Sequence, residues 1–219
     1  MTYSNSHPAL LPTGLADILP TAAAAQAAAS ARAMAVFQRE GYEHAEPPML
    51  EFEDSFLAGA GDALTRETFR MMDPQSQRML ALRSDMTPQM ARLASTRLAT
   101  APRPLRLCYA GSVLRVSGGS SARDRQLRQV GAELFGSRAA EADAEIVLLA
   151  VAALDAIGIN NISVDLNVPR MACDLTADLG LSPAAKAALM TALDRKDTAE
   201  MRRLAPAAAD MLIALTKTG

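Results

Sequence analysis

One predicted strand near the middle of the chain carries polar side chains that could bind a small charged molecule. In Gln126–Phe135, side chains alternate between two faces, so Gln129, Gly131 and Glu133 share one face. Arg115 lies in the strand predicted just before it. A guanidinium binds a carboxylate or a phosphate, a carboxylate accepts hydrogen bonds from an amine or an imidazole, and an amide can serve either. Together these residue types indicate a site for a zwitterion.

The two strands would gather these residues into one patch if they form a hairpin. A register that pairs Arg115 with Gln129 also sets Gly111 opposite Glu133, and Gly131 leaves a hollow where a ligand could approach the sheet. The alternative is an exposed sheet face on which Arg115 and Glu133 form an ordinary cross-strand pair. Polar faces of this kind are common in antiparallel sheets, so the residue types alone leave both interpretations open.

Asp85 and Thr87 lie between a predicted strand and the start of a predicted helix. They could supply a second acid and a hydroxyl to a ligand amine. The alternative is that Thr87 caps the helix and Asp85 favours its dipole. The nearby Arg123, Arg125 and Arg128 could hold phosphates or lie in solvent, and the glycines between them and Arg115 lack the spacing of a phosphate-binding loop.

The elements that must position these residues can be predicted from periodicity and from helix start and stop signals. Hairpins outnumber regular strand–helix–strand units, which favours an α+β fold with an antiparallel sheet flanked by helices, followed by a C-terminal helical segment. The apolar side of the last hairpin strand should pack on helices. The predicted elements, in chain order, are a helix from Pro20 to Glu40, an extended segment to Phe52, a glycine-bearing loop, a hairpin of Phe69–Met72 with Arg78–Arg83, a helix with Thr87 as N-cap, the strand pair described above, a helix over Ala139–Ile159, a strand over Asn161–Val168, and helices from Arg170 onward.

Composition narrows the classes of function. The 219 residues carry 22 basic and 24 acidic side chains, a net charge of −2, which argues against a nucleic-acid binder. With two cysteines outside any metal spacing and only two histidines, we expect no metal site, no cofactor and a reducing, cytoplasmic setting. No signal peptide is evident, and the alanine-rich Thr21–Phe37 is expected to be a helix outside the membrane because it is short and carries Gln26 and Arg32.

Four ordered segments together resemble the catalytic domain of histidyl-tRNA synthetase. They resemble even more closely its non-aminoacylating paralogues, the regulatory subunits of the short-form ATP phosphoribosyltransferase. The segments are LPTGLADILP (11–20), GYEHAEPPMLEFEDSF (41–56), LRSDMTPQMAR (82–92) and VLRVSGGSSARDRQLRQVGAELFG (113–136).

The resemblance implies a class II aminoacyl-tRNA synthetase-like fold, with the first helix and the following strand at a dimer interface. It also implies roles for the residues of the patch. Asp85, Thr87 and Gln129 match positions around the α-amino group of histidine, Glu133 matches the acid that reads the imidazole, and Arg115 matches an arginine that faces a carboxylate or phosphate. The candidate histidine-binding residues are therefore the same residues that suggested a zwitterion site.

Departures from the synthetase pattern argue against aminoacylation. Ser117 stands where synthetases carry an acid that helps to hold the nucleotide, and the third class-defining motif and an anticodon-binding domain are not found. We expect residues 1–169 to form part of a synthetase-like domain, residues 170–219 to form a helical segment or insertion, and the chain to end before the rest of the domain.

The resulting hypothesis is a non-catalytic regulatory subunit in the first step of histidine biosynthesis. It would have no catalytic residue of its own, would bind L-histidine for feedback control, and would act as a homodimer within a hetero-oligomer with the catalytic subunit. The alternatives are a histidyl-tRNA synthetase or related amino-acid-activating enzyme, and a structural dimerisation module that has lost its ligand.

Overall fold

The computed structural model describes residues 11–58, 62–117, 124–166, 174 and 176–217. The chain divides into two compact units, residues 1–161 and 162–219. The boundary expected at residue 170 lies outside the described residues, and it stays a prediction.

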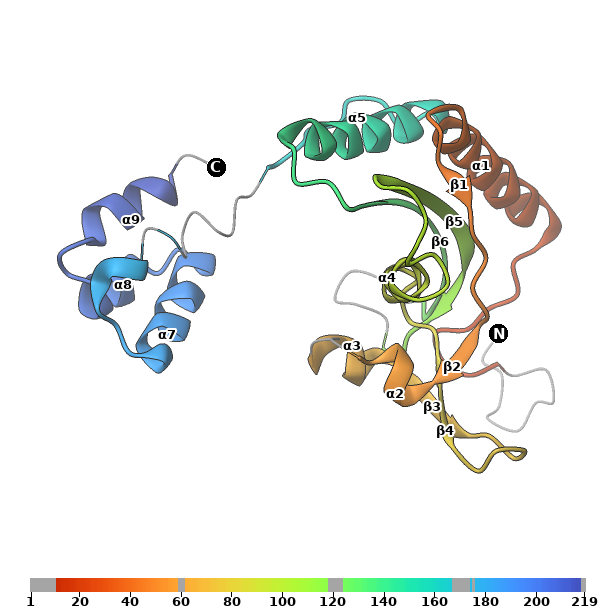
Figure 1. The fold of residues 1–219 in the computed structure, drawn as a ribbon, viewed down its shortest axis with the longest axis horizontal. Helices are drawn as coiled ribbons and strands as arrows, with labels where there is room; N and C mark the ends of the chain where they lie inside the picture. Colours follow the sequence, from red (N-terminus) through yellow and green to blue (C-terminus); the bar gives the residue numbers. More distant parts are fainter. Residues whose placement is uncertain (1–10, 59–61, 118–123, 167–173, 175, 218–219) are drawn as a thin grey trace, which may run out of the picture. The chain divides into compact units, whose positions relative to one another are not determined.

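A three-stranded sheet forms the centre of the first unit, in the order β1 (Glu43–His44), β5 (Leu105–Leu114) and β6 (Gln126–Phe135). β1 runs parallel to β5, whereas β5 and β6 are antiparallel. Figure 1 shows α1 (Pro20–Arg39) and α5 (Ala140–Ala156) on one side of β5 and β6, and α4 (Thr87–Ser95) on the other. The sheet therefore separates two hydrophobic clusters.

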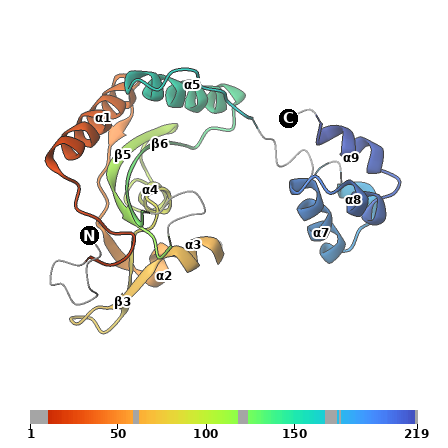
Figure 2. The same cartoon turned by 180° about the vertical axis from the view of Figure 1, so that it is seen from behind.

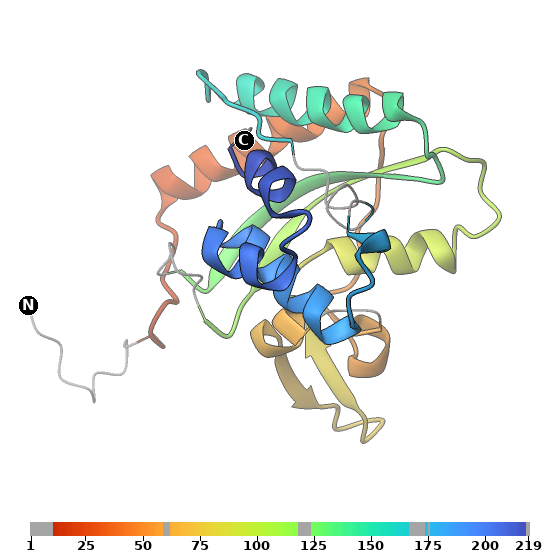
Figure 3. The same ribbon diagram turned by 90° about the vertical axis from the view of Figure 1, so that its left-hand side faces the viewer.

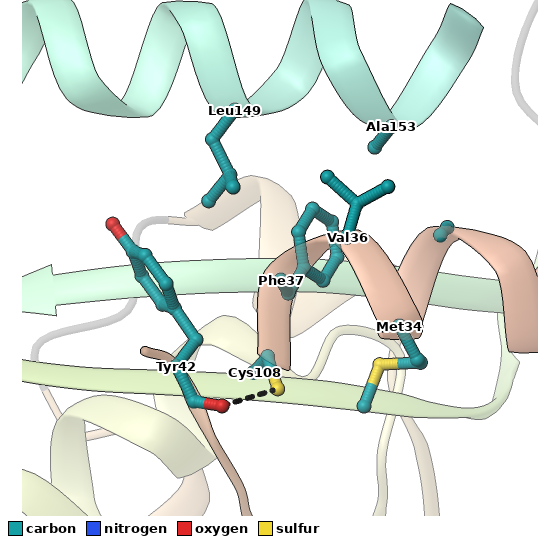
Figure 4. Packing of buried hydrophobic residues seen from close by; sticks show 8 residues of the cluster. Met34, Val36, Phe37, Tyr42, Cys108, Leu149 and Ala153 are labelled. Atoms are coloured by element: carbon teal, nitrogen blue, oxygen red, sulfur yellow. Dashed lines mark hydrogen bonds between the residues drawn. The ribbon is translucent and has the colours of Figure 1, made fainter. Parts of the chain in front are cut away.

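The cluster under α1 and α5 combines alanines with larger apolar side chains. Phe37 of α1 and Leu149 of α5 pack towards Cys108 of β5 (Figure 4). The predicted apolar side of β6 is confirmed here, because Val130 and Ala132 pack against this cluster. Alanine suits this layer because it favours helix and lets the helices approach the sheet closely.

α1 begins and ends where sequence signals place it. Pro20 is its first residue, where a missing N–H costs little. Gly41 follows the helix with φ of +85°, a left-handed conformation that glycine adopts without strain. The predicted helix from residue 20 to 40 is therefore confirmed.

The other face of the sheet packs on α4. Its cluster combines Met86 and Met90 from the start of that helix with alternate residues of β5, which are Leu105, Leu107, Tyr109 and Val113. The same face of β6 carries Gln129 and Glu133, because each pairs directly with a residue of this set or with Gly111. The polar patch thus lies between the sheet and the first turn of α4.

A second, antiparallel sheet joins β2 (Leu50–Phe52), β4 (Met79–Leu82) and β3 (Phe69–Met72). The predicted β3–β4 hairpin is confirmed, and Figures 2 and 3 show it at the end of the first unit away from α5. Two short helices flank the predicted glycine-bearing loop (residues 56–64), α2 (Glu53–Phe56) before it and α3 (Asp62–Glu67) over its last residues, and the glycines of this loop lie outside the described residues.

The second unit is helical, as predicted. A short 3-10 helix, η1 (Ala177–Leu179), precedes α7 (Pro183–Asp194), α8 (Thr198–Leu204) and α9 (Ala209–Leu215). Ser182 caps α7 through a hydrogen bond from the amide of Ala185, and Asp197 caps α8 through one from Glu200. These helices enclose their own core around Leu189, Met201 and Leu212.

Two predicted elements differ from the structure. Residues 161–166 are not a strand, although alternation suggested one; the rest of that predicted strand lies outside the described residues. Thr87 is not the N-cap of α4 but its first residue, with Met86 as N-cap. The Thr87 hydroxyl instead donates to Glu133 of β6, on the sheet face that packs against α4.

Candidate functional site

The β5–β6 register differs from the predicted one by four residues. Gln129 lies opposite Gly111, and Glu133 lies opposite Leu107. Arg115 follows the last residue of β5, and its amide donates to the carbonyl of Arg125 at 2.8 Å. The predicted register is therefore wrong. Because the shift is an even number of residues, however, every side chain keeps the face that alternation assigned to it.

Four of the five predicted residues meet in one hydrogen-bonded network. Gln129 Nε2 donates to Asp85 Oδ1 at 3.0 Å, and Gln129 Oε1 accepts from the amide of Met86 at 2.9 Å. Asp85 Oδ1 also accepts from the amide of Thr87 at 2.8 Å. The amide side chain of β6 thus fixes the chain entering α4, and with it the position of Asp85.

Glu133 closes the other side of the network. Its Oε1 atom accepts from Thr87 Oγ1 at 2.9 Å and from the Tyr109 hydroxyl at 3.2 Å. The two hydroxyls lie 3.1 Å from each other. While Glu133 is ionised, the two hydroxyl protons of Thr87 and Tyr109 must serve three short contacts, two to Glu133 and one between the hydroxyls. Protonation of Glu133 adds a third proton to the network.

Burial and a neighbouring charge act on Glu133 in the same direction. Desolvation raises the pKa of Glu133, and the charge of Asp85 raises it further, whereas the bonds from Thr87 and Tyr109 lower it. Two carboxyl groups in a half-buried site favour a ligand that carries positive charge or N–H donors.

Arg115 lies at the edge of this network. Its Nε donates to the carbonyl of Ser84 at 3.4 Å, next to Asp85 in the chain. The alternative interpretation, an Arg115–Glu133 cross-strand pair, is wrong, because the two residues pair with Arg125 and Leu107 instead. The structure brings the guanidinium beside the acidic network without neutralising Glu133.

Neither glycine leaves an open hollow. A Cβ at Gly131 would lie 2.6 Å from Cζ and from the hydroxyl oxygen of Tyr109. A Cβ at Gly111 would lie 2.5 Å from Nη2 of Arg83 and 2.8 Å from the sulfur of Met86. The glycines make room for these side chains, so the predicted hollow at Gly131 is already filled.

Sequence reasoning missed Tyr109 and Arg83. Tyr109 alternates with Leu107 and Gly111, and it reads as a core residue; the usable signal was that a buried tyrosine hydroxyl needs a partner. Arg83 is 5% exposed and donates from Nε to the carbonyl of Ser112 at 2.8 Å and from Nη1 to that of Pro47 at 2.9 Å. It ties the chain before β2 to the edge of β5.

The described part of the chain offers neither a cluster of metal ligands nor a helix that could span a membrane. No group of three or more histidine, cysteine, aspartate or glutamate side chains there could hold a metal ion. Within those same ranges, every helix is too short or too polar to cross a membrane.

Comparison with known proteins assigns the family. The family model described as "Histidyl-tRNA synthetase" matches residues 14–218. The chain belongs to this family. Its fold is the class II synthetase-like fold: a histidine–tRNA ligase subunit from Alicyclobacillus acidocaldarius superposes with a TM-score of 0.71 at 27% identity, covering 92% of this chain and 57% of that one.

Curated relatives within the family carry a regulatory name. The ATP phosphoribosyltransferase regulatory subunit of Rhodospirillum centenum is 48% identical over 211 residues, which cover 96% of this chain and 55% of the relative. That of Rhodospirillum rubrum is 46% identical over 218 residues, covering 100% of this chain and 57% of the relative. The chain thus spans about half the length of the curated relatives that it matches.

Proposed function

We propose that this chain acts as a non-catalytic regulatory subunit of a short-form ATP phosphoribosyltransferase, in the first step of histidine biosynthesis. The observation that carries the proposal is the identity of 46–48% with four relatives that bear this name, over at least 94% of the chain. No cofactor is needed for this role.

The acidic network is the proposed sensor of L-histidine. Asp85, Thr87 and Gln129 would surround the α-ammonium group, and Glu133 would accept a hydrogen bond from the imidazole. Arg115 would face the carboxylate. The geometry supports this assignment because one oxygen of each carboxyl group is held by the protein, through Thr87 and Gln129 on Asp85 and through Thr87 and Tyr109 on Glu133. Charge-assisted hydrogen bonds to the second oxygens would supply the binding energy.

The proposed partners are the catalytic phosphoribosyltransferase and a second copy of the regulatory chain, in the cytoplasm. A groove of about 950 Å³ lies along α1 and the segment before β2, and Met49 beside it is 49% exposed. These features support α1 and the following strand as the homodimer surface. The exposed faces of α7 to α9 are candidates for contact with the catalytic subunit.

The assay that tests the proposal measures phosphoribosyl-ATP formation by a short catalytic subunit. The rate is compared with and without this chain while histidine is titrated. Stimulation that histidine reverses supports the regulatory role. A well-folded chain that leaves the rate unchanged, alone and when lengthened to the full size of its relatives, argues against it.

The alternative function is that of a histidyl-tRNA synthetase or a related amino-acid-activating enzyme. The description of the family model favours it, and Ser117 in place of the nucleotide-holding acid disfavours it. Exchange of pyrophosphate into ATP with histidine separates the two, since only an activating enzyme catalyses this exchange. A structural module without a ligand would show no rise in melting temperature with histidine.

Glu133→Ala should abolish the response to histidine while leaving the fold intact, because Glu133 is half-buried at the edge of the cluster. The response is read in the same rate assay, and the fold by circular dichroism. The exposed Glu141→Ala, in the first turn of α5, is the matched control and should respond like the unmodified chain. A folded Glu133→Ala chain that keeps its response would remove this residue from the site.

A further inference from the structure

Tyr109 contacts the acidic network from its buried side, and it is not one of the residues proposed to touch the ligand. It is 3% exposed, and its hydroxyl lies within hydrogen-bonding distance of Glu133 and Thr87. A buried tyrosine in a sheet needs only a packing role to explain its presence. Three features of its surroundings point to a further role.

The first feature is the seat of the aromatic ring. Tyr109 lies directly opposite Gly131 in the β5–β6 ladder. Its ring occupies the space that a Cβ of Gly131 would need, at 2.6 Å from that position. The glycine therefore lets the ring lie across the neighbouring strand, and this placement brings the hydroxyl to Glu133, two residues further along β6.

The second feature is the proton of the hydroxyl. Burial, together with the charges of Glu133 and Asp85, raises the pKa of Tyr109 to about 12. The phenol therefore stays protonated at neutral pH and remains a hydrogen-bond donor. Tyr109 of β5 and Asp85 of the segment before α4 are the titratable groups that shift the pKa of Glu133, and the guanidinium of Arg115 lies at the edge of the same network.

The third feature is that the two carboxylate oxygens of Glu133 have different surroundings. Both donors, Thr87 and Tyr109, meet Oε1 of Glu133. Oε2 accepts no hydrogen bond from any residue that the structure describes. One oxygen is held by the protein and the other is left for a ligand donor.

We propose that Tyr109 is a positioning residue, which holds Oε1 of Glu133 so that Oε2 is presented to a ring N–H of the bound amino acid. This inference rests on the proposed function, since it names how the same site orients its imidazole-binding acid. Tyr109 acts through Glu133 and need not touch the ligand.

The test compares Tyr109→Phe with Tyr42→Phe in the full chain. Tyr42 is the matched control because it is also buried, at 2% exposure, and donates to another carboxylate, Glu145, at 2.8 Å. Calorimetric titration with L-histidine between pH 5.5 and 8 should show binding about 3- to 10-fold weaker for Tyr109→Phe, the size expected for the loss of one typical hydrogen bond, because Tyr109 acts on the ligand only through Glu133. Tyr42→Phe should bind histidine like the unmodified chain.

A second measurement needs no ligand. The carboxyl carbon of Glu133, assigned by comparison with Glu133→Gln, is titrated by NMR. Loss of the Tyr109 donor removes a contact that favours the ionised form, so the midpoint of Glu133 should rise in Tyr109→Phe and stay unchanged in Tyr42→Phe. The acid limb of histidine binding should move to higher pH with it. Fluorotyrosine keeps the ring and is a stronger donor, so it should move the midpoint the opposite way, which keeps the test available if Tyr109→Phe does not fold.

Each outcome decides the proposal. An unchanged Glu133 midpoint in folded Tyr109→Phe overturns it, and weaker histidine binding with an unchanged midpoint means that Tyr109 acts by another route and overturns it as well. If the unmodified chain binds no histidine, the proposed function fails, and the ligand-free titration still determines whether Tyr109 positions Glu133.

Discussion

The ion pair between Arg106 and Glu145 joins the sheet to the helix layer, and its loss should have a measurable pH signature. Arg106 Nε and Nη2 donate to the two carboxylate oxygens of Glu145 at 2.6 and 2.7 Å, and the Tyr42 hydroxyl donates to Oε1 at 2.8 Å. The bidentate bond from Arg106 is the main cause that lowers the pKa of Glu145 from 4.5 to about 2. One carboxyl group thus connects β5, α5 and Tyr42, which lies between α1 and β1.

The structure bounds the size of this contribution. At about 1.4 kcal/mol per pKa unit, the shift corresponds to a ceiling of about 3 kcal/mol at neutral pH. The side chains of Arg106 and Glu145 are 31% and 30% exposed, so solvent screens part of it. Glu145→Gln should therefore lower the free energy of unfolding by about 1–2 kcal/mol at pH 7.

The pH dependence gives the sharper test. Because the pKa is lower in the folded state, the stabilisation is complete above about pH 4.5, where the unfolded carboxyl is ionised, and is lost as the pH falls towards 2. The difference between the unmodified chain and Glu145→Gln should therefore shrink steadily below pH 4.5. A difference of equal size at pH 7 and pH 3 would refute the electrostatic reasoning and indicate a packing effect.

Urea unfolding followed by tyrosine fluorescence is the appropriate assay. The chain has no tryptophan, and its three tyrosines all fall within residues 1–161, so this signal reports the first unit. Glu40→Gln is the control, because Glu40 is 54% exposed and its 3.4 Å pair with Arg39 should contribute almost nothing.

Two other substitutions or modifications test the packing around the sheet. Gly131→Ala should cost about 1–3 kcal/mol in urea unfolding, because its Cβ would lie 2.6 Å from the Tyr109 ring; most of this cost should disappear when Tyr109 is also replaced by valine, and a cost that persists would point to the backbone instead. Cys108 is fully buried and burial raises the pKa of its thiol, so it should resist alkylation at pH 8 until the chain is unfolded in denaturant. Peptide mass mapping reads this site separately from Cys173, and rapid labelling of Cys108 in the folded chain would contradict the packing in Figure 4.

The faces of the strands could be predicted from the sequence, whereas the register could not. Alternation has a period of two, so it correctly placed Gln129 and Glu133 on one face of the strand and the apolar Val130 and Ala132 on the other face. It cannot distinguish registers that differ by an even number of residues. The predicted register put Arg115 opposite Gln129, whereas in the structure Arg115 lies opposite Arg125, just beyond the end of β5. What fixes the pairing is contact between side chains that are distant in sequence.

The candidate binding residues were easier to predict than the residues that support them. Asp85, Thr87, Gln129 and Glu133 carry polar groups at positions where a strand or a helix start would not need them, so the sequence reveals them. Tyr109 and Arg83 look like ordinary interior and strand residues, and their roles follow only from carbonyl and carboxylate partners supplied by other segments. The residues 161–166 show the opposite case, since alternation without a neighbouring strand to pair with does not make a strand.

The pairing of Tyr109 with Gly131 also affects how the β5–β6 hairpin reaches its register during folding. In a register shifted by four residues, Tyr109 would lie opposite Phe135 and Gly131 opposite Val113, yet each side chain would still lie on the same face of the sheet. Such a mispaired hairpin would bury nearly the same hydrophobic surface as the native one and would lack only the fit of large against small. The large ring of Tyr109 fits only opposite a residue without a side chain, which Gly131 provides. This fit distinguishes the native register from a mispaired register that would satisfy the hydrophobic pattern equally well.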